Sequence, residues 1–321
     1  MKLFRGLYNL PHPPVGSVVT IGNFDGVHRG HQAVIQTLCE MGREKDLPTT
    51  LICFEPTPQE FFAGNHPPAR LTRLGEKLSL LAQTGLDQVL VLRFDARLAQ
   101  LPADTFVKHV LVEGLAAKQV LIGADFRYGH QRKGTLASLM EAGEQHGFEV
   151  KQAPTFNLDN ERISSSRVRA ALANSKLELA SRLLGRNYSL CGRVIHGDKR
   201  GREWGYPTVN IPLQRRVSPV SGIYIVQVDG AGPQPVYGAA SIGTRPTVGG
   251  EKTLLEVHLL DFNEDIYGHR LQVTLLHKLR EEAHFDTVAS LRAAIDKDVE
   301  QTRAWLQEKG VTSPQPPAPS L

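Results

Sequence analysis

The sequence has few cysteines, no long hydrophobic run and no large excess of charge of either sign. No apolar stretch approaches the roughly 20 residues that a membrane-spanning helix requires, and the N-terminal segment MKLFRGLYNLPHPP is too rich in proline for a signal peptide. Cys39, Cys53 and Cys191 are far apart and show no pairing pattern, which is typical of reduced thiols. We therefore expect a cytoplasmic protein with no membrane partner.

The charge balance excludes further classes of protein. With 37 Lys and Arg against 33 Asp and Glu, the 321-residue chain has a net charge of +4. This mild excess suits anionic small molecules but is too small and too dispersed to indicate DNA or RNA. The sequence also lacks a G-x-x-x-x-G-K-[ST] motif, so a nucleotide site must differ from a Walker loop. We expect small-molecule substrates and no nucleic-acid partner, and the oligomeric state stays open.

Residues 17 to about 185 alternate short apolar runs with amphipathic stretches. SVVTIG, TTLICF, QVLVLRF and KQVLIG are continuous apolar runs, and intervening segments such as HQAVIQTLCEMGREK have helical spacing. The alternation predicts a parallel sheet with helices on both faces, and hence an α/β, Rossmann-like domain over residues 1–185. Ligands bind at the carboxyl ends of the strands in such sheets, so the loops after Gly22, Phe54 and Gly123 are candidate sites.

The pattern changes near Gly185. The later runs, among them GYPTVNI, GIYIVQV, VYGAASIG and RLQVTLLHKL, alternate only in part and are interrupted by Gly, Pro, Asp and Asn. They predict an antiparallel β-barrel or sandwich over residues 186–310, closed by a long C-terminal helix with Asp286 as its N-cap. The residues expected to share one face of that helix are Val288, Leu291, Ile295, Val299 and Thr302. The proline-rich tail, residues 311–321, is expected to be disordered.

The stretch GNFDGVHRGH, residues 22–31, lies between a predicted strand and a predicted helix. A helix N-terminus has free N–H donors and attracts phosphate, and the glycines let the backbone turn and approach a nucleotide closely. His28 and His31 are three residues apart, so both project on one face, where they can donate hydrogen bonds to a phosphate. Two alternatives are histidines that only cap the helix or face solvent, and a zinc site, which would need a third ligand that the spacing does not supply.

Four segments of the first half carry a resemblance to a known family. GNFDGVHRGHQ resembles the HxGH signature of the nucleotidyltransferase superfamily, in the form found in bacterial bifunctional riboflavin kinase/FMN adenylyltransferases. GADFRYGHQRKG (123–134) resembles the loop of that family that contacts flavin and phosphate, and ISSSRVRAAL (163–172) resembles its ISSTxxR motif, with Ser166 in place of the usual threonine. FEPTPQEFF (54–62) resembles the loop after the second strand, with Thr57 in place of a common histidine.

The resemblance implies an adenylyltransferase site in the first domain. Its catalytic residues would be His28, His31 and Arg167. The residues that it assigns to nucleotide and flavin binding are Gly22, Asn23, Phe24, Asp25, Gly30, Asp125, Arg132, Ser164 and Ser165. Taken alone, SSSRVR favours a polar N-cap followed by a solvated basic helical turn. Beside the HxGH segment, its hydroxyls and guanidinium are interpreted as phosphate ligands.

The second half resembles the flavokinase domain of the same family. GRVIHGDKRGREWGYPTVNI (192–211) contains PTVN where the family has PTAN, and SIGTRPTVGG, LEVHLLDF (255–262) and LREEAHFD (279–286) also match. The cofactor-binding residues that this implies are Gly197, Lys199, Gly205, Pro207, Thr208, Asn210 and Arg280, with Thr208 and Asn210 holding Mg²⁺.

Elementary chemistry agrees with this assignment. A kinase needs a phosphate cradle, a divalent cation and a group that orients the acceptor hydroxyl. The glycine-rich, basic segment around Lys199 can wrap phosphates, and strand alternation puts Glu256 and His258 on one face. Glu256 could accept the proton of the ribityl 5′-hydroxyl as a general base. The alternative is an ordinary half-buried strand whose polar face meets water.

The sequence therefore predicts a two-step flavin enzyme. The second domain would phosphorylate riboflavin with MgATP to give FMN, and the first would transfer an adenylyl group from a second ATP to FMN, giving FAD and pyrophosphate. Two other interpretations remain: a monofunctional nucleotidyltransferase with a flavin-binding β domain, and a binding module without catalysis.

Overall fold

The computed structural model describes residues 1–64, 66–197, 205–247 and 250–311. The chain forms two compact units, one of Met1–Pro68 with Thr72–Ser165 and one of Ala69–Leu71 with Ser166–Leu321. The segment from Ser166 to Gly185, which the sequence pattern placed in the first domain, groups by its contacts with the second unit.

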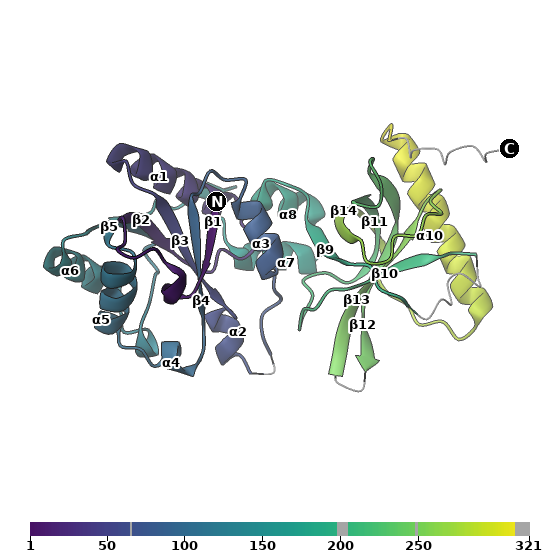
Figure 1. Cartoon of the computed structure of the whole chain (residues 1–321). Helices are drawn as coiled ribbons and strands as arrows, with labels where there is room; N and C mark the ends of the chain where they lie inside the picture. Colours follow the sequence, from purple (N-terminus) through teal and green to yellow (C-terminus); the bar gives the residue numbers. More distant parts are fainter. Residues whose placement is uncertain (65, 198–204, 248–249, 312–321) are drawn as a thin grey trace. The chain divides into compact units, whose positions relative to one another are not determined.

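A parallel six-stranded sheet forms the first unit (Figure 1). Its strands in chain order are β1 (Lys2–Arg5), β2 (Ser17–Ile21), β3 (Thr49–Glu55), β4 (Gln88–Arg93), β5 (Ala117–Ile122) and β6 (Glu149–Gln152). Their order across the sheet is β1-β4-β3-β2-β5-β6, and every neighbouring pair is parallel. The predicted Rossmann-like parallel sheet is confirmed.

Both faces of this sheet are covered. Adjacent strand residues point to opposite faces, so Val18 packs in one apolar cluster and Val19 in the other. Helices α1 (Arg29–Lys45) and α3 (Leu74–Leu81) contribute to the cluster of Val18, and α6 (Leu136–His146) with the π-helix η2 (Val107–Gly114) contributes to the other. The shorter elements are η1 (Leu7–Asn9), α2 (Pro58–Phe62), α4 (Ala96–Ala99), α5 (Ala103–Phe106), η3 (His130–Arg132), β7 (Asn157–Leu158) and β8 (Glu161–Arg162).

The strand order places the candidate loops. Strand β2 pairs with β3 on one side and with β5 on the other, so the chain changes direction across the sheet at β2. In open α/β sheets ligands bind beside the carboxyl ends of the strands at such a switch point. The loops that leave β2 after Ile21 and β5 after Ile122 are therefore neighbours at the expected position.

The second unit contains an antiparallel six-stranded barrel. Its strands are β9 (Ser189–Arg193), β10 (Thr208–Pro212), β11 (Gly222–Asp229), β12 (Val236–Thr247), β13 (Gly250–Leu259) and β14 (Arg270–Arg280), in the order β10-β13-β12-β11-β14-β9. Just beyond β9, the N–H of Ile195 donates to the carbonyl of Asn210 on β10 at 2.9 Å, so the first and last strands meet. This contact makes the fold a nearly closed barrel rather than a sandwich.

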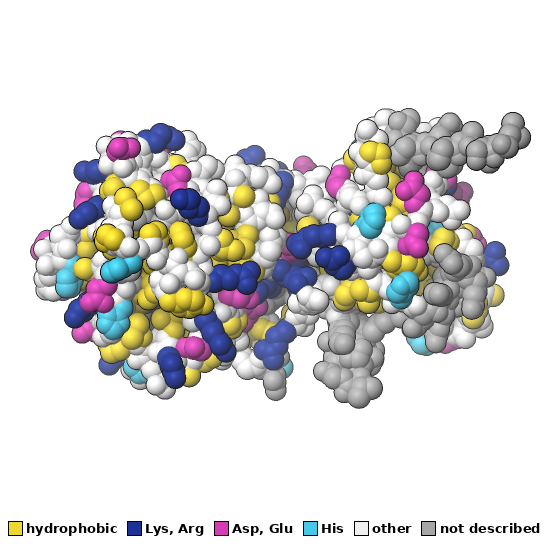
Figure 2. Space-filling view, in the orientation of Figure 1, with side chains coloured by type: hydrophobic (Ala, Val, Ile, Leu, Met, Phe, Trp, Pro, Cys, Tyr) yellow, Lys and Arg dark blue, Asp and Glu magenta, His cyan; other side chains and the backbone are white. Residues whose placement is uncertain are grey.

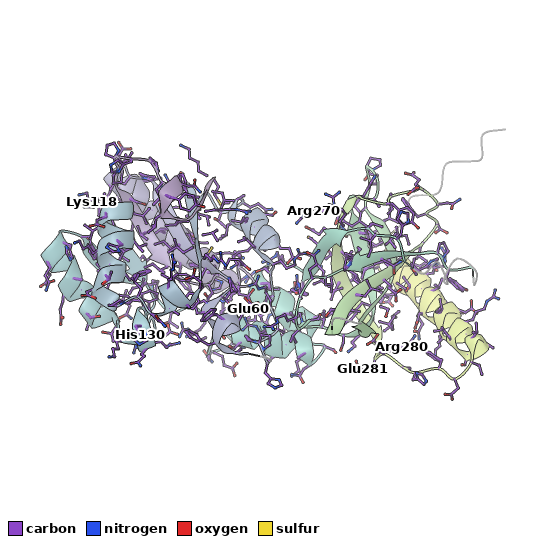
Figure 3. The ribbon with its side chains drawn as sticks, turned by 60° about the horizontal axis from the view of Figure 1, so that its bottom comes forward. Glu60, Lys118, His130, Arg270, Arg280 and Glu281 are labelled. Carbon is purple, nitrogen blue, oxygen red and sulfur yellow. The ribbon has the colours of Figure 1, made fainter. Side chains whose placement is uncertain are left out.

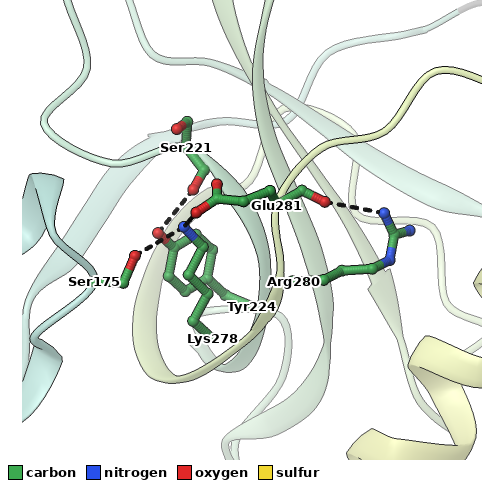
Figure 4. Close-up of polar contacts among 6 residues, drawn as sticks. All are labelled: Ser175, Ser221, Tyr224, Lys278, Arg280 and Glu281. Atoms are coloured by element: carbon green, nitrogen blue, oxygen red, sulfur yellow. Dashed lines mark hydrogen bonds and ion pairs between the residues drawn. The ribbon is translucent and has the colours of Figure 1, made fainter.

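Helices α7 (Ser165–Ala173) and α8 (Leu177–Leu184) precede the barrel and are tied to it within the second unit. The ammonium of Lys278 donates to Ser175 Oγ at 2.8 Å and to Glu281 Oε1 at 2.6 Å (Figure 4). Beneath it, Tyr224 is fully buried and donates to the carbonyl of Ser221, and burial raises the pKa of this phenol to about 12.

The last helix, α10 (Val288–Glu308), begins one residue later than predicted. Thr287, not Asp286, is its N-cap: the Thr287 hydroxyl accepts from the N–H of Ser290 at 3.1 Å. The predicted apolar face is only half right, because Val288 is exposed while Thr302 is buried. The tail prediction concerns residues 312–321 almost entirely, which lie outside the described residues.

Candidate active sites

The loop after β2 is built around His28. His28 is the N-cap of α1 and is 4% exposed, and its Nδ1 accepts from the N–H of His31 at 3.2 Å. Because Nδ1 is an acceptor in this bond, the neutral ring carries its proton on Nε2. His28 is thus a helix cap, as the simpler alternative held, but a buried one whose proton is on Nε2.

His31 lies against His28. The two imidazole rings are stacked with centroids 3.6 Å apart and an interplanar angle of 14°, and the ring of Phe24 lies 4.7 Å from that of His31. Burial lowers the pKa of His31 well below its usual value, and the positive charges of Lys77 and Arg162 act in the same direction. His31 is therefore a neutral imidazole at pH 7. Its Nδ1 is buried and has no hydrogen-bond partner among the described residues.

Glycines make this packing possible. A Cβ on Gly30 would lie 3.2 Å from Nδ1 of His28 and 3.5 Å from the carbonyl of Ile163, so Gly30 makes room for the histidine ring and the neighbouring chain. A Cβ on Gly22 would lie 3.0 Å from the Phe24 ring. Gly26 has φ +84°, a conformation that favours glycine.

Asp25 organises the loop from inside. It is buried, and its carboxylate accepts from the N–H of Thr72 at 2.9 Å and from the Thr72 hydroxyl at 3.1 Å. The same hydroxyl accepts from the N–H of Gly26, and Ser165 Oγ donates to the carbonyl of Asp25. These contacts fix the loop to the residues just before α3 and at the start of α7. Asn23, between the glycine and Phe24, is half-buried.

The loop after β5 contributes an ion pair. Asp125 accepts two hydrogen bonds from the guanidinium of Arg162 on β8, at 3.0 and 3.1 Å. These bonds hold the pKa of Asp125 below its usual value. Arg132 is exposed and has φ +59°. Ser164 directly precedes α7, and Arg167, in its first turn, groups with the second unit.

Thr57 has a local structural role. It is the N-cap of α2: its hydroxyl accepts from the N–H of Glu60 at 3.3 Å, and Glu60 Oε2 accepts from the N–H of Thr57 at 3.0 Å. This is a capping box, whose T-x-x-E spacing is visible in TPQE. Figure 3 labels Glu60 among the side chains of this region.

The barrel brings the second set of predicted residues together. In the antiparallel register of β10 and β13, Thr208 lies opposite His258, and Asn210 lies opposite Glu256. Residues directly opposite share a face of the sheet, so these four side chains form one polar group. The intervening Val257 and Leu255 are fully buried, which places the apolar side of β13 in the core.

A cavity of about 250 Å³ lies beside Thr208 and Asn210, the two members of this group on β10, and the β13 residues that line it are Val257 and Leu259. The described residues that line it include Gly197, Thr208, Asn210, Glu264 and Asp265. A Cβ on Gly197 would overlap the Asn210 amide, so a glycine is required there. Lys199 lies outside the described residues.

The remaining predicted residues of the barrel surround the same region or lie elsewhere. Gly205 has φ +88°, and the carbonyl of exposed Pro207 accepts from Nδ1 of His258 at 3.0 Å. Burial lowers the pKa of His258. Arg280 is instead paired with Asp298 on α10, through Nε at 2.9 Å and Nη2 at 2.7 Å. The structure thus gives Arg280 a bond within the protein.

Sequence reasoning missed three groups of interest. Arg162 and Lys77 place positive charge near His31, and the acidic residues 264–265 line the barrel cavity. A signal for Lys77 existed: with Leu74, Leu78 and Leu81 it follows the i, i+3, i+4, i+7 spacing of an apolar helix face. No signal linked Arg162 to Asp125, because that pairing depends on the tertiary fold.

A switch-point loop with paired histidines, followed by a barrel with a polar cavity, defines a two-domain transferase of phosphorus-containing groups. The FAD synthetase family model matches residues 11–167, and the riboflavin kinase family model matches residues 184–306. The chain belongs to the family of bifunctional riboflavin kinase/FMN adenylyltransferases. It phosphorylates riboflavin to FMN and adenylylates FMN to FAD, and the presence of both domains favours this function over a monofunctional nucleotidyltransferase.

Relatives of that name are similar over nearly the whole chain. The protein of Escherichia coli K12 is 49% identical over 98% of this chain and 100% of its own length. Those of Pseudomonas fluorescens and Haemophilus influenzae are 47% and 45% identical, each over 95% of this chain and over 97% and 99% of their own lengths.

A solved structure shares the fold of the whole chain. A crystal structure from Streptococcus pneumoniae, described as a macrolide-efflux protein, is 30% identical, with a TM-score of 0.78 over 95% of this chain and 100% of that one. In the described part of the present chain, no helix has the length and hydropathy needed to cross a bilayer.

Proposed function

We propose that adenylyl transfer takes place at the β2–α1 loop, with His28, His31 and Arg167 stabilising the charge that develops on the phosphates. In this step a phosphate oxygen of FMN forms a bond to the α-phosphorus of ATP, and the bond from that phosphorus to the bridging oxygen breaks, releasing pyrophosphate. The observation that carries the proposal is the stacked histidine pair at the N-terminus of α1. Donors placed in advance where charge develops are a large contribution to catalysis.

The protonation of the two rings fits this role. His28 keeps its proton on Nε2, and the neutral His31 ring has one N–H donor. The transfer needs no general base, because the attacking phosphate oxygen is already ionised. The histidines therefore act as hydrogen-bond donors. The β2–α1 loop is shaped by Gly22, Asn23, Phe24 and Gly30, and it is anchored by Asp25. The residues proposed to contact nucleotide or flavin are Asp125, Arg132, Ser164 and Ser165.

We further propose that Glu256 is the general base of the kinase step. Its carboxylate accepts the proton of the ribityl 5′-hydroxyl while that oxygen bonds to the γ-phosphorus of ATP and ADP leaves. The register that sets Glu256 directly opposite Asn210, a residue that lines the cavity, supports this role. The residues proposed to surround the ATP phosphates are Gly197, Lys199, Gly205 and Pro207. Arg280 is paired with Asp298, and this pairing favours an indirect role for Arg280 in the kinase step.

The residues at the barrel cavity fit Mg²⁺. Mg²⁺ binds through one or two protein oxygens together with substrate phosphates, and the Thr208 hydroxyl and Asn210 amide oxygen lie on one face of β10 beside the cavity. Among the described residues there is no cluster of three His, Cys, Asp or Glu that would hold a metal without substrate. When bound, Mg²⁺ would neutralise charge on the ATP phosphates. In the first unit the Asp25 carboxylate is already engaged by Thr72.

We also propose functional boundaries at 1–185 for adenylyl transfer and 186–310 for the kinase, and a cytoplasmic location. In the described residues, Cys39, Cys53 and Cys191 form no disulfide, which supports that location.

One assay tests both activities together. The protein is incubated with riboflavin, ATP and Mg²⁺, and the flavins are separated over time. FMN should form first and FAD later, and omission of Mg²⁺ should abolish FMN formation. FMN formation at an unchanged rate with a metal chelator present would contradict the magnesium site at Thr208 and Asn210.

A further inference from the structure

Helix α3 carries a lysine in its apolar face. Leu74, Lys77, Leu78 and Leu81 are spaced i, i+3, i+4 and i+7, and the three leucines pack in the core beneath α1 and the sheet. Lys77 is only 1% exposed. Burying an ammonium group costs free energy unless a partner compensates its charge. A leucine would fill this position without that cost, so the charge needs an explanation.

The ammonium group of Lys77 is not paired with an acidic side chain in the part of the chain that the structure describes. Among the described residues the structure gives it no hydrogen bond and no ion pair; only the backbone N–H of Lys77 is bonded, to the carbonyl of Arg73 at 2.8 Å. The positive charge of Lys77 acts to lower the pKa of His31 and of the Cys53 thiol. Cys53 lies on β3, two residues before that strand ends. Lys77 therefore lies near both the histidine pair and the carboxyl-terminal part of β3.

Hydrogen bonds fix the start of α3 to the β2–α1 loop. Thr72, directly before the helix cap, donates its N–H to Asp25 at 2.9 Å and accepts the N–H of Gly26 at 2.9 Å. Arg73, the next residue, donates its N–H to Glu76 at 2.6 Å. Lys77 follows in the first turn of α3, so its stem begins close to the loop that carries the histidines.

The surroundings of His31 are cationic. The positive charges of Lys77 on α3 and of Arg162 on β8 both act to lower the pKa of His31. Arg162 is itself paired with Asp125. His31 Nδ1 is buried without a hydrogen-bond partner in the described part of the chain. A bound anion would satisfy the buried ammonium and this cationic site together. The anion that the reaction brings is the triphosphate of ATP.

We propose that Lys77 is a phosphate-binding residue of the adenylyltransferase site, whose ammonium group binds the β- and γ-phosphates of ATP that leave as pyrophosphate. This inference rests on the proposed location of adenylyl transfer at the β2–α1 loop. As the α-phosphorus–oxygen bond breaks, the leaving pyrophosphate gains negative charge. Lys77 stabilises that charge without transferring a proton. Its apolar surroundings strengthen the attraction, because charges interact more strongly where water is excluded.

The test is the substitution Lys77→Met in the full chain. Methionine keeps an unbranched apolar stem and removes the charge, so the core should remain packed. We expect kcat/KM for ATP in FMN adenylylation to fall at least 10-fold, riboflavin phosphorylation by the same molecules to stay unchanged, and thermal stability to be equal or higher. Lys118→Met is the matched control: Lys118 is exposed at the amino end of β5, whereas the site lies at the carboxyl ends of the strands (Figure 3), and the substitution should change neither activity.

A binding measurement tests the inference without turnover. Inorganic pyrophosphate is titrated while the imidazole NMR signals of His31 are followed, assigned with His31→Gln. Pyrophosphate should shift these signals in the wild type, and Lys77→Met should weaken the binding at least 10-fold. Binding and kcat/KM within twofold of the wild type would overturn the proposal. Loss of both activities with a lower melting temperature would also overturn it, because Lys77 would then be structural.

The histidine variants separate this inference from the function on which it rests. If His28→Ser/His31→Ala retains FAD formation, the location of adenylyl transfer is wrong and the Lys77 proposal fails with it. If that variant loses FAD formation while Lys77→Met retains it, only the role of Lys77 is wrong.

Discussion

Asn210 and Glu256 lie directly opposite each other in the antiparallel register of β10 and β13. They are 46 positions apart in the sequence, and only the pairing of these strands makes them neighbours on one face. Asn210 is also the residue at which the barrel closes, because its carbonyl accepts from the N–H of Ile195. The proposed metal ligand and the proposed base are thus positioned by the same backbone contacts that complete the fold.

Glu256→Gln should reduce FMN formation by about 10² to 10⁴ in rate, which is the usual contribution of a general base. Glutamine keeps the size of the side chain and one acceptor oxygen but cannot take the proton of the ribityl hydroxyl. Conversion of supplied FMN to FAD should be unaffected. The measurement is the rate of each step with purified flavin substrates.

Glu300→Gln is the control for this prediction, since it makes the same change at an exposed position on α10 and should be silent. A structural role of Glu256 has a different signature, namely a lower melting temperature with both activities reduced. Normal kinase turnover in Glu256→Gln would remove this carboxylate from the chemistry.

The histidine pair predicts a selective loss of FAD formation. His28→Ser/His31→Ala should lower the adenylylation rate by at least about 10², the usual cost of losing one donor that stabilises transition-state charge, and leave FMN formation intact. Serine is chosen at position 28 because it is a good N-cap and can replace the acceptor that Nδ1 offers to the N–H of His31. Flavin separation after incubation with riboflavin and MgATP measures both products.

His146→Ala, an exposed histidine in the last turn of α6, is the matched control and should behave as the wild type. A variant of His28 and His31 that makes FAD at the normal rate would show that the chemistry occurs elsewhere. Equal loss of FMN and FAD with an intact circular dichroism spectrum would contradict two separate sites.

The fold was predictable where local pattern decides it. Buried parallel strands are continuous apolar runs, as SVVTIG and KQVLIG are, and helices must cover both faces of such a sheet. The strand pattern alone left barrel and sandwich open, because the choice depends on the long-range meeting of Ile195 with Asn210, and the barrel that the flavokinase resemblance implied is confirmed. The N-cap of α10 was missed by one residue because Asp286 and Thr287 are adjacent and both are good caps.

The candidate sites were predictable where residue spacing alone brings side chains together, and not where a tertiary contact does. Histidines three residues apart must share a helical face, and alternation must put Glu256 and His258 together. The bond of Arg280 to Asp298 could not be anticipated, because a buried aspartate on a mostly polar helix looks like any solvated one until its partner is known. Thr57 as a helix cap was visible in its spacing to Glu60.

The ion pair between Asp261 and Arg303 predicts a specific dependence of stability on pH. Arg303 donates to both carboxylate oxygens, at 2.9 and 2.7 Å, and these bonds hold the pKa of Asp261 below its usual value. The ionised carboxylate is therefore favoured in the folded state. Its stabilisation is fully present above the unfolded pKa of about 3.9 and is lost as the pH falls through the lower folded pKa.

Asp261→Asn should accordingly lower the melting temperature at pH 7, and the difference from the wild type should shrink as the pH falls below about 4. Asparagine suits the backbone here, because Asp261 has φ +53° and asparagine tolerates that region. Thermal denaturation between pH 3 and pH 7 measures the effect. A difference that is constant across this range would contradict the assigned pKa direction.

The pairing of Arg280 with Asp298 decides between two roles for Arg280. Asp298 is 4% exposed, and Arg280→Met would leave its carboxylate buried without that partner, whereas Asp298→Ala leaves the more exposed guanidinium free to meet water. A structural pair therefore predicts that Arg280→Met destabilises the second unit more than Asp298→Ala does, by an amount on the order of 1–3 kcal/mol or more for an unsatisfied buried charge. Both variants should keep the wild-type KM for ATP in riboflavin phosphorylation at temperatures where they are folded. If Arg280 instead contacts nucleotide, Arg280→Met raises that KM at low temperature and Asp298→Ala does not, so kinase kinetics at 15 °C beside melting curves separate the two roles.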